Sequence, residues 1–153
     1  MSNEVEVRRL RTGDVAMMND LLSVFGDAFG ERDTYGSARP SARYLDELLA
    51  SDTFIALAAV KGDAVVGGLA AYELRKFEQE RSEIYIYDLA VVRDHRRQGI
   101  ATALIAELKG IARSRGAYVI FVQADKVDGP AIALYSRPGT REDVFQFDIF
   151  PRQ

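Results

Sequence analysis

The sequence predicts an α/β fold, and the pattern of its apolar runs is the reason. Residues 54–60 and 64–74 are apolar and partly β-branched, and Lys61-Gly62-Asp63 between them is typical of a tight antiparallel hairpin. A further β-type run at residues 82–92 is followed by an amphipathic helical pattern at 99–112 and by another β-type run at 118–124. One helix between two strands is the spacing of a crossover that joins parallel strands. We therefore expect a mixed sheet with one parallel pair.

The remaining elements fall at the two ends of the chain. At the N-terminal end, residues 5–10 predict a short strand. Thr12-Gly13-Asp14 predicts the start of a helix over residues 15–25, and Ser41 is expected to cap a second helix. Residues 26–40 are rich in helix breakers and acids, which indicates an exposed loop beside the functional site. At the C-terminal end, Pro130 predicts the start of a short helix over residues 131–136. Residues 144–149 alternate apolar and polar side chains, which predicts a last strand with one buried face.

Length and composition limit the possible functions. A chain of 153 residues is expected to form one domain over residues 1–153, with a core that needs neither disulfides nor metals. It has no cysteine and a single histidine, His95, so a thiol nucleophile, a histidine triad and a multi-histidine metal site are excluded. Without a long apolar stretch or an apolar N-terminal segment, we expect a cytoplasmic protein. The net charge of −3 argues against nucleic acid as a partner and mildly favours a small cationic substrate.

The turn before the predicted helix at 99–112 carries the clearest functional signal. It reads Arg96-Arg97-Gln98-Gly99-Ile100-Ala101, so that a glycine lies where the helix begins and two guanidinium groups stand beside it. The first N–H groups of a helix lack intrahelical acceptors and carry partial positive charge, so a phosphate can accept several of them. A solvated basic surface is an equally good interpretation of this turn on spacing alone. The turn lacks the Gly-Lys-Ser/Thr of the nucleoside-triphosphate loop and the three spaced glycines of the dinucleotide fingerprint.

These motifs resemble those of a known family. Arg96-x-x-Gly99-x-Ala101, after the strand Asp88-Leu89-Ala90-Val91 and before an amphipathic helix, is similar to the acetyl-coenzyme A signature of the GCN5-related N-acetyltransferase superfamily. Ala133-Leu134-Tyr135 with Gly139 resembles its second motif. Longer stretches, from about residue 25 to residue 148, resemble the gentamicin-type aminoglycoside 3-N-acetyltransferases. The resemblance implies a sheet of about six or seven strands that splits at the parallel pair, with about four flanking helices.

The resemblance also implies a cosubstrate, a reaction and the residues that hold them. The reaction would be direct transfer of acetyl from acetyl-CoA to the 3-amino group of a 2-deoxystreptamine aminoglycoside such as gentamicin, which confers antibiotic resistance. The diphosphate would lie on the backbone of the turn, and the pantetheine arm would add to the open edge of the preceding strand. The expected cofactor-binding residues are Leu89, Ala90, Val91, Arg96, Arg97, Gln98, Gly99, Ile100, Ala101 and Thr102. No metal is expected.

Proton transfer requires a base for the amine and an acid for the departing thiolate. Tyr135 is the expected acid, because it matches the tyrosine of the superfamily motif. Asp88 is the first candidate for the base, although strand parity leaves open whether Asp88 or Tyr87 faces the cleft, and a bulge would shift the answer. Other acids are expected to bind the polyamine sugar, namely Glu83, Asp125, Asp128 and Asp148, with Glu31 and Asp33 completing the acidic set.

One departure from the superfamily pattern and two rival functions remain. Arg137-Pro138-Gly139-Thr140 replaces the residues that usually follow the tyrosine, and Pro138 should end the helix near Ser136. The chain stops soon after Asp148, so we expect a homodimer partner or a rearranged sheet to supply what a further strand would give. The rival functions are acetylation of polyamines or protein amines, and a non-catalytic module that senses coenzyme A.

Overall fold

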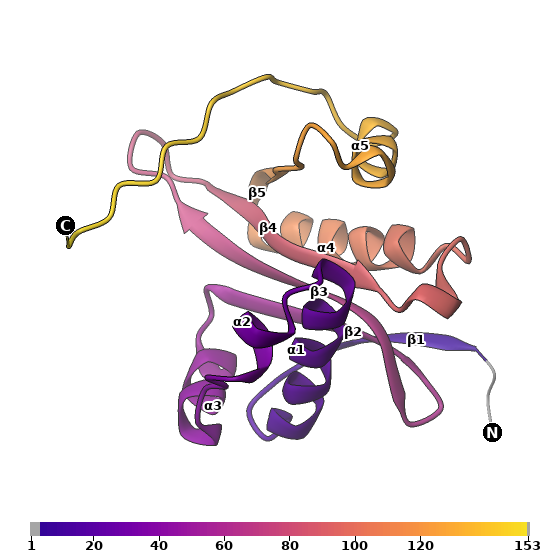
Figure 1. Cartoon of the computed structure of the whole chain (residues 1–153). Coiled ribbons are helices and arrows are strands. Elements are labelled where there is room, and N and C mark those ends of the chain that lie inside the picture. Colours follow the sequence, from indigo (N-terminus) through magenta and orange to yellow (C-terminus); the bar gives the residue numbers. More distant parts are fainter. Residues whose placement is uncertain (1–3, 153) are drawn as a thin grey trace. The chain divides into compact units, whose positions relative to one another are not determined.

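The computed structural model describes residues 4–152 (Figure 1). The chain divides into two compact units, one that runs to Gln123 and one that begins at Ala124. The first unit holds all five strands found in these residues and four of the α-helices. The second unit holds one helix and the C-terminal segment. None of the helices in residues 4–152 has the length and apolar character needed to cross a bilayer.

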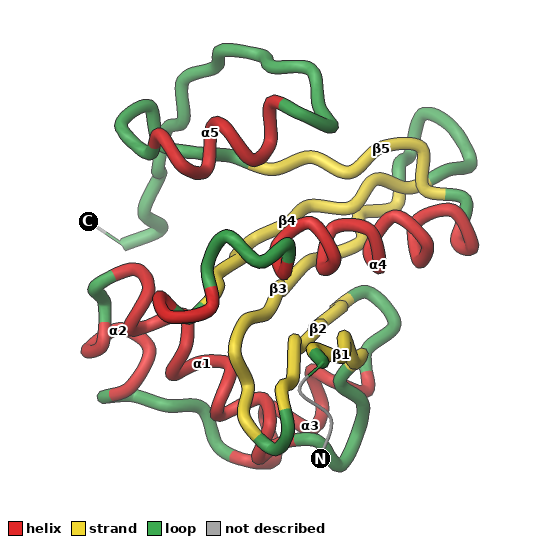
Figure 2. Tube along the Cα trace, turned by 90° about the vertical axis from the view of Figure 1, so that its right-hand side faces the viewer, coloured by secondary structure: helices red, strands yellow, loops and turns green. Residues whose placement is uncertain are grey.

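The sheet is mixed and mostly antiparallel, as predicted. Its strands are β1 (Val5–Arg9), β2 (Phe54–Lys61), β3 (Ala64–Arg75), β4 (Ser82–Val91) and β5 (Ala117–Val122). They lie in the order β1-β2-β3-β4-β5, with antiparallel pairing from β1 to β4 and parallel pairing of β4 with β5 (Figure 2). The fold class is confirmed, whereas the described residues contain five strands in place of the six or seven expected.

Helices cover both faces of this sheet, because successive strand residues point to opposite sides. The helices of the first unit are α1 (Val15–Phe29), α2 (Arg32–Gly36), α3 (Ala42–Ala50) and α4 (Ile100–Arg115). Along β2, Ala56 and Ala58 pack in a buried cluster with side chains of α1 and α3, and Ile55 and Leu57 pack in a second cluster with side chains of α4. The face shared with α1, α2 and α3 is called the α1 face below.

Two adjacent glycines in β3 allow close packing, Gly68 beside α1 and Gly67 beside β4 and Ile100 of α4. A Cβ atom at Gly68 would overlap Leu21 of α1 and would lie 2.7 Å from the carbonyl oxygen of Leu57. A Cβ atom at Gly67 would lie 3.0 Å from the carbonyl oxygen of Ala90. The β2–β3 register also shifts just before these residues. This dipeptide therefore combines a β-bulge with close packing.

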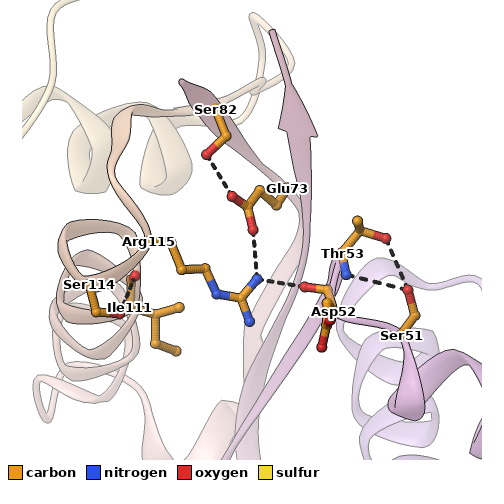
Figure 3. A network of polar contacts seen from close by, with 8 residues as sticks. All are labelled: Ser51, Asp52, Thr53, Glu73, Ser82, Ile111, Ser114 and Arg115. Carbon is orange, nitrogen blue, oxygen red and sulfur yellow. Dashed lines mark hydrogen bonds and ion pairs between the residues drawn. The ribbon is translucent and has the colours of Figure 1, made fainter. Parts of the chain in front are cut away.

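An ion-pair network fixes the C-terminal end of α4 to the sheet (Figure 3). Nη1 of Arg115 lies 2.7 Å from Oε1 of Glu73 and donates to the carbonyl oxygen of Asp52 at 2.5 Å. The hydroxyl of Ser82 donates to the other carboxylate oxygen of Glu73 at 2.6 Å. One guanidinium therefore ties α4 to β3 and to the turn before β2, and Glu73 links the group to β4 through Ser82.

The structure corrects the prediction for residues 26–40. α1 continues to Phe29, where Gly30 ends it with a left-handed conformation (φ 64°), and α2 follows within three residues. The rings of Phe25, Phe29 and Tyr35 lie 5.9–6.2 Å apart. This aromatic cluster stabilises a helical turn that local sequence does not favour, because acids and glycines in isolation indicate a loop.

The second unit contains α5 (Gly129–Ser136) and the segment that follows it. Pro130 lies in the first turn of α5, and the helix ends at Ser136, two residues before Pro138, as predicted. The predicted strand at 144–149 is wrong: these residues form no regular structure in the described chain, and Phe145 and Phe147 are 84% and 83% exposed. Alternating apolar and polar side chains would give a strand one apolar face, but a strand is stable only when it pairs with a neighbouring strand.

Candidate active site

A bulge in β4 decides which way Asp88 points. Asp88 pairs with Ala70 of β3, and Ile86 pairs with Ala71, so that Tyr87 is an extra residue on β4. Directly paired residues share a face of the sheet, and Ala70 packs in the cluster of the α1 face, whereas Ile86 packs in the α4 cluster. Asp88 therefore lies on the α1 face, and the bulge shifts the strand parity as expected.

The carboxylate of Asp88 is half-buried and is held by a tyrosine from α2. The hydroxyl of Tyr35 donates to Oδ2 of Asp88 at 2.9 Å. Burial raises the pKa of Asp88 above its usual 3.8 and nearby Glu31 raises it further, while the hydrogen bond from Tyr35 lowers it; the net direction is upward. Burial, the bond to Asp88 and other nearby acidic groups raise the pKa of Tyr35, so this phenol remains a donor at physiological pH.

An aromatic surface lies on the α1 face of β3, β4 and β5. Tyr85 stacks on Phe121 with ring centroids 4.7 Å apart, and Tyr87 contacts both Tyr85 and Tyr72 edge-on. Tyr87, next to Asp88, is 63% exposed. Aromatic faces beside a carboxylate suit a cationic ligand, because ring and carboxylate both attract ammonium groups.

The parallel strands separate beyond Ile86, and the predicted split at the parallel pair is confirmed. Their pairing ends at Ile86 with Val122, while β4 continues to Val91. Leu89, Ala90 and Val91 therefore lie on a stretch of β4 that has no β5 partner. Backbone groups along such an edge can pair with the amides of an extended ligand.

The turn that follows β4 exposes the first turn of α4. Gly99 (φ 80°) precedes Ile100, and no side chain caps the helix. A Cβ atom at Gly99 would meet nothing within 4 Å, and Gln98, Gly99 and Thr102 are exposed. Arg97 (φ 62°) is the one described non-glycine residue with a positive φ. Open, uncapped amides fit a diphosphate.

Arg96 differs from its neighbours in this turn. Its Nε donates to the carbonyl oxygen of Val91 at 3.1 Å, so the side chain ties the turn back to the end of β4. We interpret Arg96 as a residue that shapes the turn. Its positive charge also attracts an anion bound there.

The expected substrate-binding acids lie in different places. Glu83 is near the start of β4, five residues before Asp88, which is about 16 Å along a strand. It accepts from the hydroxyl of Tyr118 at 3.2 Å and lies 3.8 Å from Nζ of Lys76. The structure thus does not bring Glu83 to Asp88; Glu31 on the α1 face influences Asp88 instead.

The other expected residues belong to the second unit. Tyr135 is half-buried on α5. Asp128 caps α5 by accepting from the amide of Ala131 at 3.1 Å, and the carbonyl of Asp125 accepts from the amide of Asp128. Asp148 is exposed and accepts from the side-chain amide of Gln146. Their roles toward a substrate stay predictions, and at least one oxygen of Asp128 has a structural role.

Tyr35 is the residue of this site that sequence reasoning missed. It lies in the segment expected to be a loop, 53 residues from Asp88 in the chain. Two aromatic residues in an acid-rich stretch, Phe29 and Tyr35, were the available signal, because a large aromatic ring usually packs against apolar neighbours. Residues 4–152 hold no group of three His, Cys, Asp or Glu side chains placed to bind a metal ion.

Comparison with known proteins identifies the family. The profile of the Acetyltransferase (GNAT) family matches residues 17–139, which include β2 to β5, the uncapped turn and α5. The chain belongs to this family. The resemblance noted in the sequence is confirmed. The expected enzyme class, an acetyl-CoA-dependent N-acetyltransferase, is confirmed with it.

Individual relatives of this GNAT protein include aminoglycoside acetyltransferases. One, from an uncultured soil metagenomic sample, is 59% identical; the match covers 95% of this chain and 97% of that chain, with a TM-score of 0.94. A second soil metagenomic enzyme, solved in complex with sisomicin, is 30% identical with a TM-score of 0.90 over 97% of both chains. Streptothricin acetyltransferase of Streptomyces lavendulae is 34% identical over 78% of this chain, and the match spans 56% of the length of that enzyme.

Proposed function

We propose that this GNAT protein is an aminoglycoside 3-N-acetyltransferase that confers resistance to antibiotics such as gentamicin. The observation that carries the proposal is the 59% identity, over 95% of the chain, to a soil aminoglycoside acetyltransferase. The α1 face supports it, because Asp88, Glu31 and exposed Tyr87 provide negative charge and aromatic faces for a polyamine. Attack at the 3-amino group rests on the likeness of the sequence to the gentamicin-type enzymes.

Two features of the first unit fit acetyl-CoA, which supplies the acetyl thioester when bound. The open backbone amides of Arg97, Gln98, Gly99, Ile100, Ala101 and Thr102 would hold its diphosphate, and the charge of Arg97 would add to the attraction. The unpaired edge at Leu89, Ala90 and Val91 would hold the pantetheine arm. Arg96 would keep the strand and the turn in register through its bond to Val91.

Asp88 is the proposed base for the acceptor amine. Oδ2 is occupied by the Tyr35 hydroxyl, which leaves Oδ1 to accept a proton from the ammonium group. The raised pKa brings the carboxylate closer to the pKa that suits a base at neutral pH. In this proposal Glu83, Asp125, Asp128 and Asp148 remain candidates for binding the other ammonium groups of the substrate.

Tyr135 is the proposed acid, which donates its hydroxyl proton to the departing thiolate. We expect Tyr135→Phe to lower kcat about 100-fold, the lower end of what a general acid contributes, with the Kd of coenzyme A changed less than twofold. Stopped-flow or steady-state thiol release and calorimetric titration measure the two quantities. Equal activity of both proteins from pH 6 to pH 9 would remove Tyr135 from this role.

A thiol-release assay over gentamicin, spermidine and a panel of amine-bearing peptides tests the substrate class. We expect kcat/KM for gentamicin to exceed that for the other amines by at least 100-fold. A preference for spermidine or for peptides would replace the aminoglycoside with another amine. Coenzyme A binding without thiol release on any amine would favour a non-catalytic sensor.

We further propose that residues 1–153 act as one acetyltransferase domain, in the cytoplasm, as a homodimer. The family match from 17 to 139 supports one domain, because it crosses the boundary between the two compact units. Exposed apolar side chains in the C-terminal segment support self-association: Val144, Phe145, Phe147, Ile149 and Phe150. Light scattering after size exclusion should give twice the chain mass, and a monomer at micromolar concentration would exclude the dimer.

A further inference from the structure

We infer that Tyr35 is a positioning residue for Asp88: its hydroxyl holds Oδ2 and thereby turns Oδ1 toward the acceptor amine. This inference rests on the proposed function, since it gives Asp88 the role of base. The hydroxyl lies 2.9 Å from Oδ2, and it is the one hydrogen bond to this carboxylate found among residues 4–123. Two side chains 53 residues apart meet at the point where the pairing of β4 with β3 shifts by one residue.

The backbone of Tyr35 is fixed by a dedicated arginine. The guanidinium of Arg39 donates to the carbonyl oxygen of Tyr35 from Nε at 3.2 Å and from Nη2 at 3.1 Å. The same group donates to the carbonyl oxygen of Asn19 at 3.0 Å and to the hydroxyl of Ser23 at 3.2 Å. Both of these acceptors lie on α1, so Arg39 ties the end of α2 to α1.

The ring of Tyr35 is fixed by packing. Its centroid lies 6.2 Å from that of Phe25 and 6.0 Å from that of Phe29. A Cβ atom at Gly26 would lie 3.1 Å from the Cβ of Tyr35, so a larger residue there would displace α2. A five-residue helix has little stability of its own. The contacts that hold α2 in place also fix Tyr35, the residue that donates to Asp88. We therefore assign Tyr35 a role beyond packing.

The charges around Asp88 allow the effect of the hydroxyl to be predicted. The titratable groups that face it or act on it are Tyr35 from α2, Glu31 before α2, and Tyr72, Tyr85 and Tyr87 of the sheet. Within this set the Tyr35 hydrogen bond lowers the pKa of Asp88, while burial and Glu31 raise it. Removing the hydroxyl should therefore raise the pKa of Asp88 and release the carboxylate from its orientation.

The test is Tyr35→Phe, which keeps the ring and its packing and removes the hydroxyl. We expect kcat for gentamicin to fall about 10-fold, less than the loss of about 100-fold or more that follows removal of the base itself, and the acidic limb of the pH–rate profile to move to higher pH. The KM for acetyl-CoA should stay within twofold. Tyr44→Phe is the matched control, because Tyr44 is a 59% exposed residue of α3, and both activity and profile should match the wild type.

A double-mutant cycle separates positioning from a structural effect. If the hydroxyl acts through Asp88, Tyr35→Phe should lower kcat in the wild type and change it less than twofold in an Asp88→Asn background. A similar loss in both backgrounds, or a wild-type pH profile in Tyr35→Phe, would overturn the inference.

A direct titration makes the outcome independent of the substrate. Side-chain ¹³C NMR of labelled aspartate, with the Asp88 signal assigned by its absence in Asp88→Asn, should show a higher pKa for Asp88 in Tyr35→Phe. An unchanged pKa would overturn the inference even in an active enzyme. A raised pKa together with a wild type that acetylates no aminoglycoside would support the contact and refute the proposed function alone.

Discussion

Asp88→Asn should lower kcat for aminoglycoside acetylation at least 100-fold, which is the lower end of the contribution of general acid–base catalysis. The amide keeps the size of the side chain and an oxygen that can accept from Tyr35, but it cannot take a proton from the acceptor amine. The acidic limb of the wild-type pH–rate profile, which we expect above the usual aspartate pKa of 3.8, should be absent in the variant. Steady-state kinetics at a series of pH values gives both results.

Stability distinguishes this loss from damage to the fold. Burial raises the pKa of Asp88, so the ionised form costs stability at neutral pH, and a neutral amide should leave the unfolding temperature unchanged or slightly higher. Asp63→Asn, on the exposed turn between β2 and β3, is a matched control that should retain wild-type activity. Wild-type kcat in Asp88→Asn would assign the base to water or to another carboxylate.

Arg115→Met should lower the free energy of unfolding by about 2–4 kcal/mol, because removing one partner of a mostly buried ion pair leaves the other charge without compensation. The side chains of Arg115 and Glu73 are 20% and 15% exposed, and the guanidinium also satisfies the carbonyl oxygen of Asp52 (Figure 3). For a chain of this size the change corresponds to a fall in Tm of about 5–15 °C. Chemical denaturation and calorimetry measure the two values.

A control on the same helix removes the same charge. Arg113→Met changes an exposed arginine in the last turn of α4 and should alter the unfolding free energy by less than about 0.5 kcal/mol. Equal losses in Arg113→Met and Arg115→Met would show that helix charge, and not the Glu73 network, stabilises this end of α4.

The same network predicts a pH dependence. Burial acts to raise the pKa of Glu73, but hydrogen bonds from Ser82 and Arg115 and the charge of Arg115 lower it, and the net direction is downward. A carboxylate with a lowered folded-state pKa contributes stability that is present above its unfolded pKa, here 4.5, and is lost as the pH falls through the folded value. The stability advantage of the wild type over Glu73→Gln should therefore shrink as the pH falls below about 4.5.

Features set by neighbouring residues were predictable from the sequence. Gly99 between a basic turn and an amphipathic helix, the two-residue turn at Gly62-Asp63, and the end of α5 before Pro138 each depend on the backbone preferences of glycine or proline. The crossover from β4 through α4 to β5 follows from the order of the apolar runs.

Features set by distant contacts were not predictable in the same way. The face of Asp88 depends on how β4 pairs with β3, since the extra residue Tyr87 reverses the parity. α2 forms because Tyr35 packs on α1 and is held by Arg39, which a window of acids and glycines does not reveal. The alternation at 144–149 predicted a strand because a sequence pattern shows which face would be buried, but not whether a neighbouring strand is present.

Identification of the acetylated nitrogen is the most direct test of the proposed activity. The purified protein, incubated with gentamicin and acetyl-CoA, should give one product with a single acetyl group, and two-dimensional NMR should place that group on the 3-amino nitrogen of the 2-deoxystreptamine ring. Acetylation of another amino group, or unmodified gentamicin after prolonged incubation, would contradict the account.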